Sequence, residues 1–486
     1  MSERQYQWSD SDDDDSNEPM IYSEDMSRTP FMNSPRMFFQ ERFQAGSIKG
    51  SVFTLVVAIV GAGTLSVPFA IEQSGLLIGP GLFVLGALMA YFSLRILILS
   101  SVLTGVKSYT KIAHNLYGPR MSYFAQAMLL LNLYGTCISY IVAAGNLITP
   151  VVKIAFGYKT DELVVPFYLE TRFIMVFCTS VIVLPLALQR TMGALRYASL
   201  IAVFCTCYLS LVVFAKYFEY CGNNEEVKMN LETVNHTISQ NVQCFWKGRT
   251  ADEEEIHFFP QGNILARLLK TIPIVVYAYT CHPNVLPVFM ELQKPTRKRM
   301  SKVVGRSIGT AMFLYLVLGI FAYLTFKSQL ECSDGSFLKN DYHSDASVLI
   351  GAVGMSVSVI SAIPLFVHAF RGNIFTLALD EFSDPKDAPL KWHFGVSIGL
   401  LVAAVIPAIL VKDISLVFGM LGSTTNPMIC FVLPSMFILR AAPSGMYRTE
   451  KIVSVIIATV ISIISVISLG NTFFGAHDTT CPDPVN

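Results

Sequence analysis

The sequence predicts an all-α polytopic membrane protein with about eleven transmembrane helices, on the basis of three observations. The chain of 486 residues is 53% hydrophobic and 14% charged, whereas about a quarter of the residues in soluble globular proteins are charged. The charges gather in an N-terminal tail and in connecting loops, and the apolar stretches between them reach the roughly 20 residues that span a hydrocarbon core. Two of these stretches are interrupted by small or polar residues, which predicts broken helices.

The expected spans form two repeats of five and one additional helix. The first repeat covers residues 50–218, the second covers 263–439, and the additional helix covers 451–474. An odd number of spans in each repeat inverts the second repeat relative to the first. We expect spans at residues 50–73, 76–103, 122–149, 171–189, 192–218, 263–290, 303–326, 346–371, 393–411, 414–439 and 451–474.

The distribution of Lys and Arg predicts the orientation, because cytoplasmic loops retain positive charge. The most basic loop runs from Lys294 to Lys302, and placing it in the cytoplasm also places the N-terminus there. The loop 219–262 and the C-terminal residues 475–486 are then extracellular or lumenal. The outer loop carries the sequon at Asn235, which predicts glycosylation and agrees with this orientation.

The first 49 residues predict a disordered cytoplasmic tail, because they are polar and carry the acidic run Asp12–Asp15. The tail is either a solvated leader or a segment that phosphorylation controls and cytoplasmic regulators bind. The net charge of the chain is zero, so we expect no nucleic acid partner. The apolar spans make the lipid bilayer an expected partner.

Four of the ten cysteines fall on the oxidising outer side, where disulfides persist. Cys221 and Cys244 lie close together in the same outer loop, which favours a disulfide between them and leaves Cys332 to pair with Cys481. The chain has neither a CxxC motif nor a Cys/His cluster, so we expect no structural metal site.

The two interrupted spans predict the substrate site. Gly61, Ala62, Gly63 and Thr64 interrupt the first span, and a polar segment with Pro283 and Pro287 interrupts the sixth. A proline removes a backbone donor, so we expect the sixth span to break at these prolines. Unwound half-helix ends present free N–H groups and carbonyls, which suit the two ends of an amino acid zwitterion. The glycines would let a carboxylate approach the backbone, although small residues also serve close helix packing.

Polar side chains of the sixth span are predicted to line the other side of this site. They are Tyr277, Tyr279, Thr280 and His282. Each tyrosine could equally be a packing residue, and His282 could be either a titrating group or a neutral hydrogen bonder. Polar residues of span 3, among them Asn132, Tyr134, Thr136, Ser139 and Tyr140, form a stripe that we expect to face the central cavity, and Ser423–Pro427 make a further polar break in span 10.

A small cation could bind between spans 1 and 8. Ser358 and Ser361 lie on one face of span 8, and their hydroxyls could join the carbonyl of Val60 in the unwound part of span 1. Serines in membrane helices also commonly bond their own backbone, which is the alternative reading.

The sequence of the sixth span resembles the signature of the sodium-coupled neutral amino acid transporters, within the amino acid/auxin permease family. Residues 281–287 read Cys-His-Pro-Asn-Val-Leu-Pro, and the first-span motif at 61–68 and the end of span 8 at 363–371 are also similar. The resemblance covers residues 48 to 474. It implies the inverted five-plus-five fold of the LeuT type, with alternating access around a substrate held by broken helices 1 and 6.

One departure concerns the coupling ion. Family members that use sodium carry an asparagine at the position of Val57, and proton-coupled relatives carry one at the position of Ile59. Sodium coupling, proton coupling and exchange therefore all stay open, and no other cofactor is expected. Neutral substrates are favoured because no acidic residue lies deep in the membrane beside the breaks. A cationic substrate is the alternative, because Glu72 lies near the outer end of span 1.

These observations predict a secondary active transporter of small or neutral amino acids. The alternative is an amino acid sensor that signals through its cytoplasmic tail. ATP-driven transport is not supported, because the chain has no GxxxxGK[ST] motif, and an enzyme is not expected because neither His282 nor His368 has a paired nucleophile. The topology fits the plasma membrane and an endolysosomal or vacuolar membrane equally.

Overall fold

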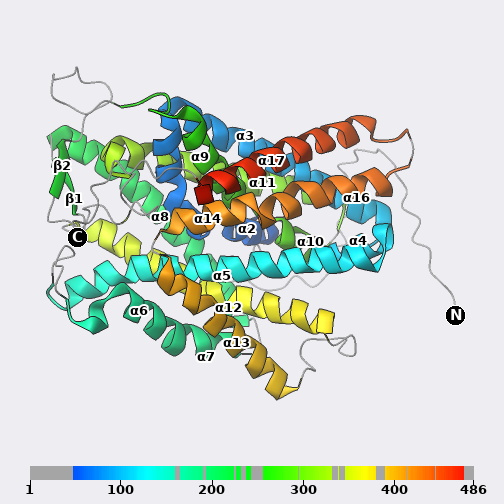
Figure 1. The fold of residues 1–486 in the computed structure, drawn as a ribbon, viewed down its shortest axis with the longest axis horizontal. Coiled ribbons are helices and arrows are strands. Elements are labelled where there is room, and N and C mark those ends of the chain that lie inside the picture. Colours follow the sequence, from blue (N-terminus) through cyan, green and yellow to red (C-terminus); the bar gives the residue numbers. More distant parts are fainter. Residues whose placement is uncertain are drawn as a thin grey trace, which may run out of the picture. The chain divides into compact units, whose positions relative to one another are not determined.

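The computed structural model describes most of the chain beyond the N-terminal tail (Figure 1). The predicted tail, the sequon at Asn235 and the cysteines Cys244, Cys332 and Cys481 lie outside the described residues. All described elements belong to one unit that begins at Phe43. The described residues are 47–158, 165–189, 193–223, 226–230, 237–241, 256–293, 295–330, 338, 345–378, 389–411, 413–443 and 445–474.

Helices make up almost all of the described residues in the first half of the chain. A 3-10 turn, η1, separates two of them, and a π turn, η3, separates two others. The elements are α2 (Ile48–Ile59), η1 (Ala62–Ser66), α3 (Val67–Thr104), α4 (Tyr109–Tyr117), α5 (Pro119–Ala155), η2 (Phe167–Leu169), α6 (Thr171–Cys178), η3 (Thr179–Val183), α7 (Leu184–Ala187) and α8 (Gly193–Asn223).

The second half is likewise helical, and it contains two helices that stop in mid-span. The elements are α9 (Ile264–Ala278), α10 (His282–Glu291), α11 (Arg297–Phe326), η4 (Lys327–Leu330), α12 (Ala346–Ala378), α13 (Leu390–Leu410), α14 (Ile414–Ser423), α15 (Thr425–Pro427), η6 (Met428–Val432), α16 (Leu433–Ala441) and α17 (Arg448–Phe474).

Between the halves, part of the predicted outer loop forms a β-hairpin, which the sequence analysis did not predict. Strands β1 (Glu226–Asn230) and β2 (Thr237–Asn241) pair antiparallel, with Glu226 opposite Asn241. Antiparallel strands need only a short connection, so a hairpin can form within such a loop. The all-α prediction therefore holds for the membrane part and not for this loop.

Nine helices among the described residues are long and apolar enough to cross a bilayer, which confirms a polytopic membrane protein. The first of these runs from Gly63 to Thr104, is 42 residues long and bends at Gly75, where φ is 78°. Two shorter apolar helices, Ile48–Ile59 and Thr171–Ala187, fall below the length of a full span. The sequence analysis predicted eleven passes. The nine helices give eleven if Gly63–Thr104 is divided at its bend into two passes and the shorter Thr171–Ala187 helix is counted as one more.

The bend at Gly75 is held by the chain segment that precedes α9. The N–H of Leu76 donates to the carbonyl of His257 at 2.9 Å, and the N–H of Leu77 donates to the carbonyl of Phe258 at 3.0 Å. A helix start leaves its first N–H groups without intrahelical partners, and this segment supplies carbonyls to two of them. The start of the sixth predicted span is thereby fastened to the junction of the first two.

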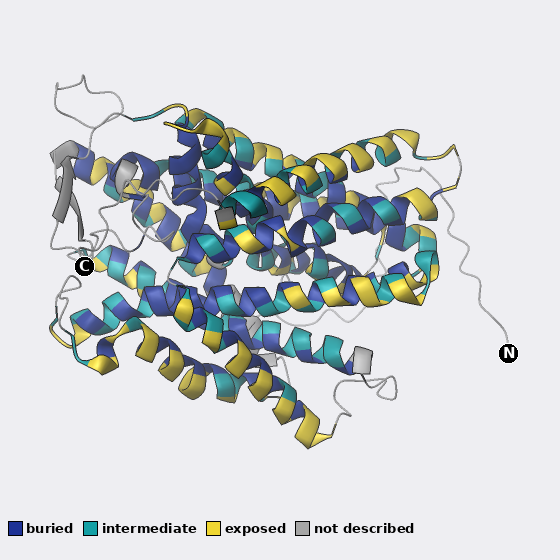
Figure 2. Ribbon diagram, viewed as in Figure 1, coloured by how far each residue is buried: buried dark blue, intermediate teal, exposed yellow. Residues whose placement is uncertain are grey.

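The helices of the two predicted repeats are interleaved. Helix α5 packs against α12 and α13, and α11 packs against α3, α2 and α8. Buried residues concentrate where these helices meet, while the outward faces of α6, α13 and α17 are exposed (Figure 2). Those faces are apolar, as Leu410 (76% exposed) and Val466 (71% exposed) illustrate. Apolar side chains on an outer face are expected where the surrounding solvent is hydrocarbon.

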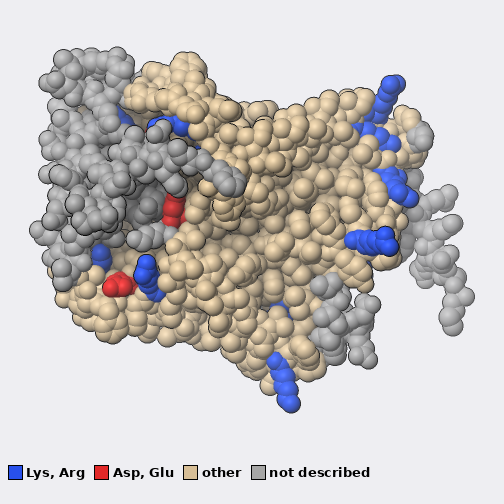
Figure 3. Space-filling view, in the orientation of Figure 1, with Lys and Arg blue, Asp and Glu red and all other residues tan. Residues whose placement is uncertain are grey.

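On the face drawn in Figure 3, most charged side chains lie toward the two ends of the bundle. Figure 3 shows Lys and Arg at the end of the molecule where α4 lies, and an uncharged belt between that end and the other. This is the end that the sequence analysis assigns to the cytoplasm.

An ion pair at the opposite end ties α8 to the start of α12. The ammonium of Lys216 pairs with the carboxylate of Asp345, to which the Ser347 hydroxyl also donates at 2.8 Å. Burial raises the pKa of Asp345, but the hydrogen bonds from Lys216 and Ser347 outweigh burial and lower this pKa below its usual value. Since the folded-state pKa is lowered, the stabilisation is present above the unfolded pKa of about 3.9 and is lost as pH falls through the folded value.

We therefore expect the thermal unfolding midpoint of the purified protein to fall more steeply below about pH 4 than that of Asp345→Asn. At neutral pH the substitution should lower stability by about 1 kcal/mol, since the pair is only partly buried. The measurement is a melting curve in detergent at a series of pH values. Parallel pH profiles for the two proteins would contradict this role of Asp345.

Candidate functional site

The first predicted break lies where the sequence analysis placed it. Helix α2 ends at Ile59, Val60 leaves the helical conformation, and the chain continues in the 3-10 turn η1 before α3 begins. The N–H of Gly61 bonds the carbonyl of Ile59 at 3.0 Å, and the N–H of Thr64 bonds the carbonyl of Gly61 at 3.1 Å. Residues 61–64 therefore form a tight, non-α turn in the middle of an apolar segment.

The second break lies slightly before the predicted prolines. Helix α9 ends at Ala278 and α10 begins at His282, so the unwound residues are Tyr279–Cys281. Pro283 lies in the first turn of α10, where its missing N–H would have no intrahelical partner in any case, and Pro287 lies inside α10. The expectation that the helix breaks at these prolines is thus corrected. They mark the start of the second half-helix.

The two breaks meet through small and aromatic residues. A Cβ atom on Gly63 would lie 3.4 Å from the ring of Tyr277, and a Cβ atom on Gly61 would lie 1.8 Å from the hydroxyl oxygen of Tyr140 on α5. The absence of side chains at these glycines therefore brings the backbone of the first break directly against two phenols. Of the residues predicted for the site, the structure brings Gly61, Gly63 and Tyr277 together.

Aromatic rings surround this meeting point. The ring of Tyr277 stacks on Phe418 with centroids 4.4 Å apart. The ring of Tyr140 packs edge-on against Phe366 of α12 at 4.8 Å. These contacts position polar groups beside an unwound backbone.

Thr64 adds an unused hydrogen-bonding group. Its side chain is completely buried, and its hydroxyl has no hydrogen-bond partner among the described residues. Buried hydroxyls are normally paired, so an unpaired one next to a helix break is a candidate ligand contact. The sequence analysis predicted Thr64 for this site.

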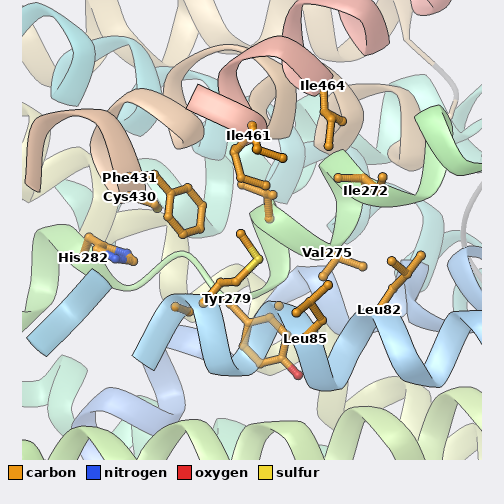
Figure 4. A pocket seen from close by; sticks show the side chains of 15 residues that line it. Leu82, Leu85, Ile272, Val275, Tyr279, His282, Cys430, Phe431, Ile461 and Ile464 are labelled. Atoms are coloured by element: carbon orange, nitrogen blue, oxygen red, sulfur yellow. The ribbon is translucent and has the colours of Figure 1, made fainter. Parts of the chain in front are cut away.

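Tyr279 and His282 face a different space. They line a groove between α3, α9, η6 and α17 whose other lining residues are apolar (Figure 4). A zwitterion would lose its hydration there without gaining polar partners, which is costly. The ring of Tyr279 also packs edge-on against Tyr315 with centroids 5.5 Å apart. The predicted contact of Tyr279 and His282 with the substrate stays a prediction.

The side chains of His282 and Thr280, both predicted for the site, form hydrogen bonds at the second break. The imidazole Nε2 of His282 lies 3.3 Å from the hydroxyl of Ser93 on α3, and that hydroxyl donates to the carbonyl of Cys430. The hydroxyl of Thr280 donates to the carbonyl of Val276 at 2.8 Å. Both side chains thus stabilise the unwound segment, and Ser93 is a partner that the sequence did not indicate.

The polar stripe of α5 divides between two neighbours. The amide of Asn132 donates to Thr425 at 3.1 Å and to Asn426, which both belong to the predicted break in span 10. Helix α14 indeed ends at Ser423, and Thr424 has non-helical φ and ψ. Tyr134 instead donates to the carbonyl of Ala403 on α13 at 2.9 Å, so the stripe faces the cavity only in part.

The hydroxyl of Ser361, which was predicted to bind a cation, donates to the carbonyl of Val357 at 2.6 Å within its own helix. Ser358 is buried, and α12 packs chiefly on α5 and α8. Among the described residues, no hydrogen bond joins either serine to Val60. The cation site at Val60, Ser358 and Ser361 stays a prediction.

Of the four cysteines predicted on the outer side, only Cys221 lies in the described part of the chain. Cys221 is disulfide-bonded, whereas the other six cysteines in the described part of the chain are free. The partner of Cys221 is therefore Cys244, Cys332 or Cys481. The pairing with Cys244 stays a prediction.

One hydroxyl connects the two breaks, and the sequence analysis missed it. Tyr315 of α11 donates to the carbonyl of Ile59 at 2.8 Å and to the carbonyl of Ala278 at 3.0 Å. These are the last residues of α2 and α9. A single tyrosine in an apolar span has no sequence signal that separates it from a packing residue.

Comparison with known proteins shows the family of the chain. Residues 44–475 match the family described as Transmembrane amino acid transporter protein. The chain belongs to this family. It is a multi-pass membrane protein of a transporter family and not an enzyme. Sodium-coupled neutral amino acid symporter 2 of Danio rerio is 27% identical over 409 residues, which cover 83% of this chain and 77% of that protein. The resemblance inferred from the span motifs is confirmed.

Proposed function

We propose that this member of the transporter family is a secondary active transporter of neutral amino acids that works by alternating access. The observation that carries the proposal is the meeting of the two breaks, with Gly63 against Tyr277 and the unpaired hydroxyl of Thr64 beside them. The N-terminal ends of η1 and α10 favour a carboxylate, and the carbonyl ends of α2 and α9 favour a cationic group. A zwitterion can use both kinds of end.

The state of Glu72 supports neutral rather than cationic substrates. Its carboxylate pairs with the guanidinium of Arg267 at 3.1 Å, and the amide of Gln73 donates to it at 2.8 Å. The carboxylate is almost fully buried in these contacts, with 7% of the side chain exposed. A carboxylate that is already paired offers little to the side chain of a lysine or arginine substrate. The similarity to a protein named sodium-coupled neutral amino acid symporter 2 points the same way.

The proposal includes eleven passes, with the N-terminus in the cytoplasm and the C-terminus on the outer side. Two observations support an inverted repeat: α2 with η1 begins the first five passes with a break, and α9 with α10 begins the next five in the same way. We further propose the Cys221–Cys244 disulfide, which requires the outer side to be oxidising, and glycosylation at Asn235, which requires this loop to lie on the outer side. The coupling ion is sodium or a proton, unless the protein works as an exchanger.

Reconstituted uptake tests the proposal. The purified protein in sealed liposomes should accumulate labelled neutral amino acids when a sodium gradient or a proton gradient is imposed, and lysine and arginine should compete weakly. Each gradient is applied separately, so that the result identifies the ion. Exchange without a requirement for either gradient would identify an exchanger.

Binding without flux, in vesicles of verified integrity and orientation, would contradict the transport proposal. It would favour an amino acid sensor instead. Removal of residues 1–45 then separates the two functions, because transport does not need the tail and signalling would.

A further inference from the structure

The hydroxyl of Tyr315 lies at the point where the carbonyl ends of both broken helices converge. It is 2.8 Å from the carbonyl oxygen of Ile59 and 3.0 Å from that of Ala278, and the side chain is completely buried. These residues end α2 and α9, so the same oxygen atom contacts the first half-helix of the first break and the first half-helix of the second.

The last carbonyls of a helix have no i+4 donor within the helix and carry the negative end of the helix dipole. The carbonyl of Ile59 accepts one hydrogen bond from the N–H of Gly61, and the Tyr315 hydroxyl donates a second one to it. In the membrane such carbonyls cannot turn to bulk water. Two such ends that face one point need a group with positive charge or a hydrogen-bond donor between them. In broken-helix transporters, a small cation coordinated by half-helix carbonyls meets this need. Here a phenol O–H, shared between the two carbonyls, lies at the same kind of position.

We propose that the Tyr315 hydroxyl is a built-in substitute for a monovalent cation between the two breaks, an inference that rests on the proposed transport function. It fixes the separation of the two half-helix ends with no ion at this point. Tyr315 is therefore a positioning residue that acts on substrate affinity through the backbone of both breaks.

The surroundings of Tyr315 hold its hydroxyl in place. Its ring packs edge-on against Phe83 with centroids 6.0 Å apart, and against Tyr279 at 5.5 Å. Tyr279 itself belongs to the unwound segment after Ala278. Because the ring is fixed by neighbours from α3 and from the second break, Tyr315→Phe should remove only the oxygen and preserve the packing.

The test compares Tyr315→Phe with wild type in substrate counterflow, with the same concentration of sodium, lithium or choline on both sides of the membrane. In choline, KM of the variant should rise about tenfold, as expected for the loss of a strong buried hydrogen bond, with a smaller change in maximal rate. Sodium or lithium should lower this KM again by entering between the freed carbonyls. The ratio of KM in choline to KM in sodium should exceed the wild-type ratio several-fold.

Tyr323→Phe is the matched control. Tyr323 also lies on α11, is 2% exposed, and donates to the carbonyl of His257 at 3.2 Å, away from both break carbonyls. It should keep the wild-type cation ratio. An unchanged KM in Tyr315→Phe, or a loss of equal size in all three cations, would overturn the proposal.

A second readout does not depend on transport. Sodium or lithium should raise the melting temperature of purified Tyr315→Phe relative to choline, and by more than in wild type, because an ion that binds only the folded state stabilises it. If wild type shows no counterflow, the transport proposal fails while this comparison still decides the role of Tyr315. If Tyr315→Phe folds only when sodium or lithium is present, the ion takes the place of the hydroxyl, as the proposal requires. A Tyr315→Phe protein that folds in none of the three salts would contradict the proposal.

Discussion

Gly61→Ala is expected to reduce amino acid uptake at least tenfold while the protein remains folded in the membrane. The new methyl group would lie 1.8 Å from the hydroxyl oxygen of Tyr140 and 3.1 Å from the adjacent ring carbon. Tyr140 cannot simply rotate away, because its ring packs edge-on against Phe366 at 4.8 Å. Either the first break or α5 must shift, and both belong to the proposed substrate site. The measurement is uptake per molecule of reconstituted protein.

The control for this variant is Gly309→Ala on α11, where an added Cβ meets no atom within 4 Å. It should transport at the wild-type rate. Tyr140→Phe removes the atom responsible for the closest contact, so the double variant Gly61→Ala/Tyr140→Phe should transport better than Gly61→Ala alone. Such a departure from additivity is the signature of two residues in contact. Full activity of Gly61→Ala would rule out a close approach of the first break to α5.

The sequence was sufficient to predict the two breaks because glycine and proline act locally. Gly61 and Gly63 permit a turn without side chains, and Pro283 marks the first turn of a helix by its missing N–H. The same local logic placed the second break a few residues too late. A proline within a helix is easily read as the point of interruption, whereas here Pro283 begins α10 and Pro287 continues it.

The composition of the site was harder to predict, because it depends on contacts between distant segments. Tyr277 and Tyr279 are two residues apart in the sequence, yet one faces the first break and the other faces an apolar groove. Periodicity cannot resolve this difference at the end of a helix. Tyr315 is separated from Ile59 by more than 250 residues and gives no local signal. Only the packing of α11 between the two breaks identifies its hydroxyl as shared.

The close contact between helices α9 and α14 depends on the absence of a side chain at Gly422. A Cβ atom on Gly422 would lie 1.9 Å from the carbonyl oxygen of Pro273 and 2.5 Å from its carbonyl carbon. These are backbone atoms inside α9, so no rotamer change can relieve the overlap. Gly422→Ala should therefore force the two helices apart and lower the free energy of unfolding by about 3 kcal/mol, at the upper end of typical overpacking costs.

Gly419→Ala is the matched control for Gly422→Ala. It lies on the same helix one turn earlier, and an added Cβ there meets no atom within 4 Å. A glycine-to-alanine change in a helix is intrinsically favourable by up to about 1 kcal/mol, so Gly419→Ala should be neutral or stabilising. Melting curves of both purified variants measure the difference. Since α9 carries Tyr277 and α14 carries its stacking partner Phe418, separation of the helices should also weaken substrate binding by a partly folded Gly422→Ala protein. Equal melting temperatures for the two variants would mean that α9 and α14 do not approach this closely.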